Sequence, residues 1–153
     1  YPKEEKDYIL GITEMASKIS ESVCEICSCR GEMFNGNSMA ARCTSHSGHL
    51  LPFFRRVMSG VNLPFIDESI GYMWREMMTR LFFQLEDDYN NNEMPEVVFK
   101  RAWIANNNEL CIEYNGGNKV TEGMVTVLLE YARLVDAETG IIKDLDFNNK
   151  DID

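Results

Sequence analysis

The sequence predicts an α+β protein in which amphipathic helices pack on a small antiparallel sheet. Three observations support this fold class. Long stretches repeat apolar residues every three or four positions, which is the helical period. Two shorter stretches rich in β-branched and aromatic residues flank an Asn-rich turn, which indicates a β-hairpin. Nearer the N-terminus, cysteines and histidines are concentrated within residues 24–49, which indicates a loop held together by side-chain chemistry.

The chain has 153 residues, of which 44% are hydrophobic and 26% are charged. These fractions are typical of a soluble globular protein and exclude a disordered or collagen-like chain. The length suits one compact core, which we expect residues 1–60 and 61–153 to share. No run of about 18 apolar residues is present, so we expect no transmembrane helix and no membrane partner. No signal-peptide pattern opens the chain, so we expect a cytoplasmic location.

The first half is expected to hold one long helix followed by the cysteine-rich segment. Apolar residues at helical spacing predict a helix over residues 8–22, with Asp7 as its N-cap. The cysteine-rich segment follows, and Gly and Asn residues in its middle indicate a short hairpin. Residues 50–58 are apolar with a proline near their start, which favours a short helix. Helix breakers then mark a linker over residues 59–64.

The second half contains the longest helical pattern, over residues 67–89. Its broad apolar stripe includes several methionines that we expect in the core. Residues 96–105 and 109–114 predict two strands joined by an Asn-rich turn. An Asn-Gly-Gly-Asn turn at residues 115–118 separates the second strand from another amphipathic helix over residues 119–135.

The first and last of these helices resemble each other. Each follows a tyrosine and a polar turn, and Gly11 of the first aligns with Gly123 of the second. Apolar positions agree over the next turns, and Asp136 and Thr139 then stand at the positions of the first two cysteines. The pattern predicts an internal strand-turn-helix repeat whose second copy lacks the cysteines. A chance match between two amphipathic helices is the alternative.

Four of the five cysteines and both histidines lie within residues 24–49. Two residues separate Cys24 from Cys27, two separate Cys43 from His46, and 15 residues lie between the pairs. Two such pairs joined by a loop of this length are typical of a zinc ribbon, because each turn points two donor atoms the same way. The sequence therefore predicts a structural zinc ion bound by these four residues. The further candidates for the fourth ligand are Cys29 and His49.

Other interpretations of these residues stay open. A disulfide is disfavoured by the odd number of cysteines and by the expected reducing compartment. A redox Cys-x-x-Cys motif lacks its usual βαβ surroundings. A catalytic zinc ion would need an open coordination position and a carboxylate base, and Glu25, between the first two cysteines, is expected to point outward. No His-Glu-x-x-His or nucleophile motif is present, so we expect no enzyme activity.

The formal net charge is −10 and is unevenly distributed. Residues 1–60 hold seven acidic and seven basic residues, whereas residues 61–153 hold 18 acidic and eight basic ones. An acidic surface repels nucleic acid and speeds the encounter with basic proteins. We therefore expect a basic protein partner. The acidic residues expected to contact it are Glu86, Asp87, Asp88, Glu93, Glu96, Asp144 and Asp146.

Several motifs resemble a group of small, mostly uncharacterised bacterial proteins. The shared parts are a Tyr-Ile-x-Gly helix start at residues 8–11, the Cys-x-x-Cys and Cys-x-x-His pairs, and a strand and Gly-Gly turn over residues 110–118. In that group the strand has a KFGGLRFY-like motif and precedes the helix. Here residues 107–114 depart from the motif and the order is rotated. The resemblance implies an α+β fold with a zinc knuckle, and such proteins resemble bacterial toxin-immunity proteins in size and acidity.

Two hypotheses of function follow. In the first, the protein is an immunity-type inhibitor that covers the active site of a basic toxin domain, such as a nuclease, with acidic surface. In the second, it is a zinc-containing adaptor or phage-borne regulatory module that binds a host protein through basic residues near the metal site. Those basic residues are Arg30, Arg42, Arg55 and Arg56.

Overall fold

The computed structural model describes residues 2–35, 39–48, 51–52 and 63–143. Within these ranges three α-helices combine with two antiparallel sheets, so the expected α+β fold is confirmed. The helices are α1 (Lys3–Ser20), α2 (Tyr72–Asn90) and α3 (Lys119–Leu134). The strands are β1 (Glu32–Asn35), β2 (Met39–Arg42), β3 (Leu51–Pro52), β4 (Val97–Ile104) and β5 (Leu110–Gly116), and a short 3-10 helix, η1, spans Thr44–His46. None of the described helices is both long enough and apolar enough to cross a bilayer.

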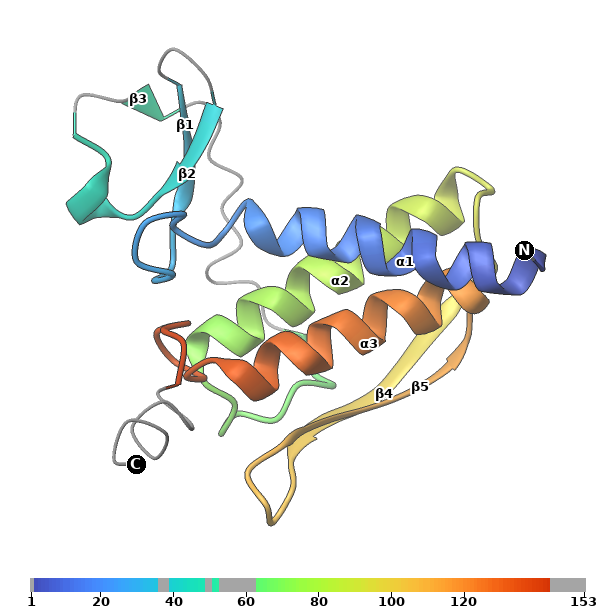
Figure 1. Ribbon diagram of the computed structural model, residues 1–153. Helices are drawn as coiled ribbons and strands as arrows, with labels where there is room; N and C mark the ends of the chain where they lie inside the picture. The colour runs from blue at the N-terminus through green and yellow to red at the C-terminus, as the bar shows by residue number, and fades with distance from the viewer. Residues whose placement is uncertain (1, 36–38, 49–50, 53–62, 144–153) are drawn as a thin grey trace, which may run out of the picture.

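The helices form the centre of the molecule (Figure 1). They lie side by side over the β4–β5 hairpin, while the small β1–β3 sheet stands apart at the C-terminal end of α1 (Figure 1). Helix α2 contributes the methionines expected from its apolar stripe, and Met73, Met77 and Met78 are at most 2% exposed. Met15 and Ile19 of α1 join the same core. Burial of each such side chain contributes about 1.5–3 kcal/mol.

Glycines make the contact between α1 and α3. A Cβ atom at Gly11 would collide with the carbonyl oxygen of Val120, and one at Gly123 would collide with the carbonyl oxygen of Tyr8. The two helices run parallel (Figure 1). Each glycine contacts the residue that lies three positions before the glycine of the opposite helix. The two glycines aligned in the sequence therefore occupy equivalent places. The described residues hold no strand before α1, so the strand-turn-helix repeat as a whole stays a prediction.

Two predicted helix starts are wrong. Helix α1 begins at Lys3, not at residue 8, and Pro2 occupies its N-cap. The earlier start is favoured by Glu4 and Glu5, whose negative charges interact well with the positive end of the helix dipole. Helix α2 begins at Tyr72, not at residue 67. Before it, Ser69 donates from its N–H and hydroxyl to the Asp67 carboxylate at 2.9 and 3.0 Å, and this closed turn competes with helix formation.

The strands follow the predictions more closely. The predicted hairpin at residues 96–114 is the β4–β5 pair, with an irregularity between Phe99 and Arg101. The hairpin expected inside the cysteine-rich segment is the β1–β2 pair. The helix predicted over residues 50–58 is contradicted at residues 51–52, which form β3 because the open edge of β1 offers backbone partners. Residues 53–58 and most of the predicted linker at 59–64 lie outside the described residues.

The segment after α3 links the helices to the cysteine-rich segment. The carbonyl oxygen of Ala137 accepts hydrogen bonds from the N–H groups of Met73 and Trp74 at 2.8 and 3.1 Å, which satisfies the free donors at the start of α2. Two residues later, the carbonyl oxygen of Thr139 accepts from the N–H of Arg30 at 3.2 Å. One short turn therefore fixes both the start of α2 and the cysteine-rich segment.

Candidate metal centre and acidic surface

The first ligand pair sits on a tight turn just after α1. The N–H of Ser28 donates to the carbonyl oxygen of Cys24 at 2.9 Å, and the N–H of Cys24 donates to the carbonyl oxygen of Cys29 at 2.8 Å. Ser28 closes this turn in the left-handed region, at φ 67°. The backbone therefore holds Cys24 and Cys27 on one turn.

Strand β2 delivers the second pair. Cys43 follows the strand, and η1 then turns the chain so that the N–H of His46 donates to the carbonyl oxygen of Cys43 at 3.1 Å. The N–H of Glu25 donates to the carbonyl oxygen of Ala41 at 3.0 Å, which ties the first turn to β2. The β1–β2 hairpin thus folds the second pair back onto the first.

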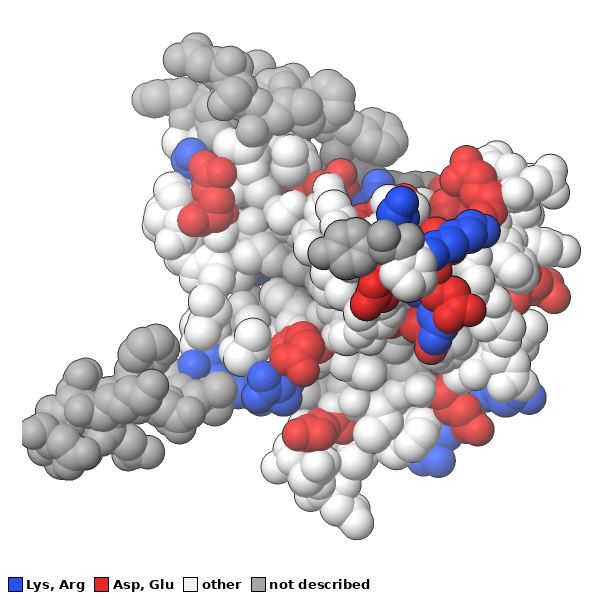
Figure 2. Space-filling model, turned by 45° about the vertical axis from the view of Figure 1, so that its right-hand side comes forward, with Lys and Arg blue, Asp and Glu red and all other residues white. Residues whose placement is uncertain are grey.

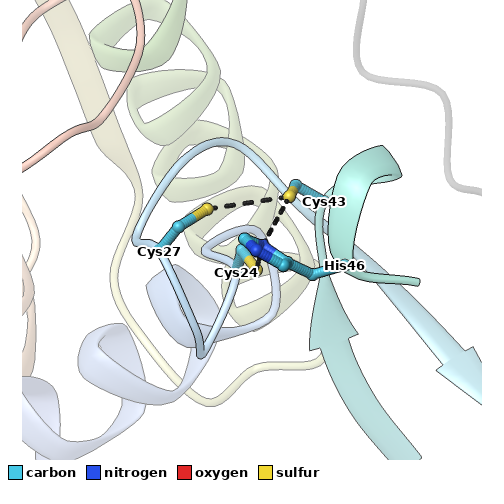
Figure 3. Close-up of side chains that lie close together, drawn as sticks. All are labelled: Cys24, Cys27, Cys43 and His46. Atoms are coloured by element: carbon cyan, nitrogen blue, oxygen red, sulfur yellow. Dashed lines mark hydrogen bonds between the residues drawn. The ribbon is translucent and has the colours of Figure 1, made fainter. Parts of the chain in front are cut away.

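The four donor atoms converge (Figure 3). All lie within 4.8 Å of one another. The Cys27 and Cys43 sulfurs are 3.6 Å apart, and Nδ1 of His46 lies 3.2 Å from the Cys43 sulfur and 3.6 Å from the Cys24 sulfur. A tetrahedron around an ion bound at ordinary zinc distances has edges of about 3.5–3.8 Å. The four side chains fit tetrahedral coordination and could hold a metal ion.

The electrostatics of the thiols favour a bound cation. Burial raises the pKa of Cys24, but N–H donors of Cys27, Cys43 and Ile26 outweigh burial and lower that pKa to about 6. Burial and then the neighbouring Cys27 and Cys24 thiols raise the pKa of Cys43. One thiolate is thus favoured, and its charge disfavours ionisation of its neighbours. A divalent cation at the centre removes that penalty.

The spare ligand candidates do not join this group. Cys29 lies close to Cys27, where its backbone N–H lowers the pKa of Cys27 and its thiol raises it, but the group of converging donor atoms within the described residues excludes it. The fifth cysteine, Cys111, is on β5. His49 lies outside the described residues.

Glu25, expected to point outward, pairs with Arg42. Its carboxylate accepts a hydrogen bond from Arg42 Nε at 2.7 Å, and the same guanidinium donates to the carbonyl oxygen of His46 at 3.2 Å. Arg42 therefore connects the turn that carries Cys24 and Cys27 to the turn that carries Cys43 and His46. The Glu25 carboxylate is thus paired with Arg42 and lies outside the group of converging donor atoms.

A second arginine, Arg30, connects the cysteine-rich segment to the helices. Arg30 Nε donates to Glu76 Oε1 at 3.0 Å, and its guanidinium lies 5.0 Å from the centre of the Tyr72 ring. Glu76 belongs to α2 and its side chain is 7% exposed. Two of the four arginines expected to contact an adaptor's partner thus form internal ion pairs. The other two, Arg55 and Arg56, lie outside the described residues.

Comparison with protein-family models, with curated proteins and with solved structures finds no match. The resemblance to small bacterial proteins therefore stays a prediction. The site is assigned from the positions of its own donor atoms.

The acidic residues expected to contact a partner gather at the end of α2 and the loop after it. Glu86, Asp87, Glu93 and Glu96 are exposed, whereas Asp88 is 7% exposed and accepts a hydrogen bond from Gln84 Nε2 at 3.0 Å. Asp88 therefore contributes charge but little contact surface. The last two of the expected residues, Asp144 and Asp146, lie outside the described residues.

Tertiary packing adds one acidic residue that sequence reasoning missed. Burial, and then the charges of Asp88 and Glu93, raise the pKa of Glu14 on α1. Only the packing of α1 on α2 places these carboxylates together. Figure 2 shows acidic side chains in several groups with Lys and Arg between them. On the face shown, the acidic side chains therefore form local patches and no continuous acidic surface.

Proposed function

We propose that the protein is a zinc-stabilised, non-catalytic binding protein of the bacterial immunity type, acting in the cytoplasm. It captures a basic toxin domain, such as a nuclease, and covers its active site with the acidic surface at the end of α2. The observation that carries this proposal is the group of exposed carboxylates there. Among the described residues, Glu86, Asp87, Glu93 and Glu96 form no ion pair with any Lys or Arg.

Zinc is the metal that the donor set favours. Three thiolates and one imidazole are soft ligands, and a tetrahedral arrangement of sulfur and nitrogen is typical of zinc. Four protein ligands complete the coordination, so no position is left for water or substrate. The zinc ion is therefore structural, and its role is to hold β1–β3 and the turn that carries Arg30.

Unpaired carboxylates favour binding over stability. Their mutual repulsion slightly destabilises the folded protein, and a basic partner relieves it. Long-range attraction also accelerates encounter, and salt weakens it because the charges are exposed. An inhibitor that must intercept a toxin quickly benefits from both effects. The adaptor hypothesis has less support, because Arg30 and Arg42 already pair within the chain.

The test is capture of partners from the source bacterium with the purified full chain, at low and moderate salt, with metal content measured in the same sample. We expect one zinc ion per chain and a basic protein whose capture falls as salt rises. A neutral or acidic partner captured independently of salt would overturn the inhibitor proposal and favour the adaptor.

A charge variant locates the binding surface. Glu86→Gln, Asp87→Asn and Glu93→Gln together should slow association with the captured partner and flatten its dependence on salt. The matched control removes three exposed carboxylates elsewhere, namely Glu68, Glu109 and Glu113, each by substitution with glutamine. Equal association rates for the two triple variants would remove the end of α2 from the interface.

A further inference from the structure

A pocket opens beside the acidic surface, between α2 and β4. Its volume is about 280 Å³. Aromatic rings of Phe82, Tyr89 and Phe99 line it, together with the carboxylate residues Glu86 and Glu96. Cavities that take drug-sized ligands have roughly 300–1,000 Å³. This pocket is smaller, so it suits a single long side chain better than a cofactor.

Contacts with other aromatic rings hold the Phe82 and Phe99 side chains that line the pocket. The Phe82 and Phe99 rings have centroids 6.0 Å apart, and Phe65 stacks on Phe99 at 4.9 Å with an interplanar angle of 11°. These contacts hold both rings in place before any ligand arrives. Tyr89, one turn beyond Leu85 on α2, is 44% exposed and offers a ring at the rim.

The two carboxylate residues come from opposite walls. Glu86 lies in the last turns of α2, and Glu96 directly precedes β4. The N–H of Gly117 donates to the carbonyl oxygen of Glu96 at 3.0 Å, and a Cβ at Gly116 would collide with that oxygen. The Gly-Gly turn found in the sequence therefore sets the position of Glu96. Neither carboxylate is paired with a Lys or Arg among the described residues.

We propose that this pocket receives an arginine side chain of the basic partner, a step that rests on the proposed function. The apolar wall accommodates the methylene stem, and the flat guanidinium stacks on an aromatic face. Its several N–H groups can donate to carboxylates on two sides at once, whereas the lysine ammonium is a compact, strongly hydrated charge. Charge complementarity and aromatic walls together select arginine.

The probes are three pentapeptides, each blocked at both ends, with two glycines on either side of arginine, lysine or citrulline. Citrulline keeps the shape of arginine but has no charge. Binding to the full, zinc-loaded chain is followed by NMR at the rings of Phe82, Tyr89 and Phe99. We expect the arginine peptide to bind most tightly and the citrulline peptide about tenfold more weakly, with shifts confined to the pocket rings. Equal binding of the three peptides, or no shift at these rings, would overturn the proposal.

Variants test the carboxylates. Glu86→Gln with Glu96→Gln should weaken the arginine peptide about tenfold, while Glu68→Gln with Glu109→Gln, which removes the same charge elsewhere, should leave it unchanged. Both double variants change exposed residues, and thermal unfolding confirms that they fold. An equal loss of affinity for the arginine peptide in both double variants would mean that only net charge matters, and it would overturn the proposal that the pocket binds arginine.

The same variants separate this proposal from the proposed function. Arginine-specific peptide binding without capture of any basic protein would support the pocket and overturn the immunity role. Capture of a basic partner that is insensitive to Glu86→Gln with Glu96→Gln would overturn the pocket and leave the immunity role in place.

Discussion

The Arg30 side chain links the cysteine-rich segment to helix α2. It pairs with Glu76, which is almost fully buried in α2. Oε2 of Glu76 has no hydrogen-bond partner among the described residues. Burial, and then the charge of Glu76, raise the pKa of the nearby Tyr131 to about 12. Without Arg30, Glu76 would be a buried and uncompensated charge.

Arg30→Ala should therefore lower the free energy of unfolding by about 1–2 kcal/mol. Removing one partner of a fully buried pair costs roughly 3–5 kcal/mol, but 37% of the Arg30 side chain is exposed, so solvent screening reduces the loss. Arg133→Ala is the matched control, because its pair with Glu130 is exposed on both sides and is worth about 0.5 kcal/mol or less. Urea unfolding measures both. Equal losses would contradict a special role for Arg30.

At the scale of single elements, the α1–α3 contact depends on two glycines. Gly11→Ala should destabilise the protein by about 2–3 kcal/mol, because the added methyl group would clash with the backbone carbonyl of Val120, which cannot move without shifting α3. Gly123→Ala should have a similar effect, since its surroundings are equivalent. Thermal unfolding measures the loss. Ser17→Ala on an exposed position of α1 is the control and should be neutral or slightly stabilising. Tolerance of both glycine substitutions would contradict the close contact between α1 and α3.

The turn before α2 should make stability depend on pH. Hydrogen bonds from the N–H and hydroxyl of Ser69 hold the pKa of Asp67 below its usual value of 3.8. The ionised form is favoured in the folded state, so its contribution is present above pH 3.8 and is lost as pH falls through the lowered native pKa. Unfolding of the native protein and of Asp67→Asn should therefore be compared on the acid side. We expect their stability difference to shrink as pH falls, and a constant difference would contradict this assignment.

At the scale of the whole molecule, the metal-binding segment and the helical core rest on different interactions. The core contains Met15, Met73 and Leu81, each fully buried. Among the residues of the β1–β3 sheet whose burial the structure describes, the buried apolar ones are Phe34 and Ala41. We therefore expect this segment to depend on its hydrogen bonds, its ion pairs and a bound metal ion.

Removing the metal with a chelator should therefore unfold only part of the protein. We expect amide hydrogen exchange to accelerate strongly over residues 24–35 and 39–43 while amides of α2 keep most of their protection. Adding zinc back should restore protection. Loss of protection throughout, in a single transition, would mean that the metal centre and the helices form one cooperative unit.

Much of the local structure could be predicted from the sequence, because it is set by short-range patterns. The hairpin at β4–β5, the glycine turn at residues 116–117 and the end of α2 follow from residue types a few positions apart. The convergence of Cys24, Cys27, Cys43 and His46 also follows from spacing, because a turn of fixed length points its donor atoms one way. Periodicity misplaces the starts of α1 and α2, because it does not register the acidic residues that extend the first turn of α1 or the Asp67–Ser69 turn that delays α2.

Long-range contacts decided the rest. Spacing cannot tell that Arg30 meets Glu76 or that Glu14 lies near Asp88, since the residues of each pair are far apart in the chain. Nor can spacing tell that aromatic rings of α2 and β4 line one pocket, because that depends on how the strand folds back against the helix. The sequence by itself determined the fold class, the donor set and the excess of negative charge, since these depend on composition and local spacing. Only the tertiary structure decided which charged side chains face solvent unpaired and which form ion pairs within the protein. Such pairing depends on how the helices pack and not on where residues stand along the chain.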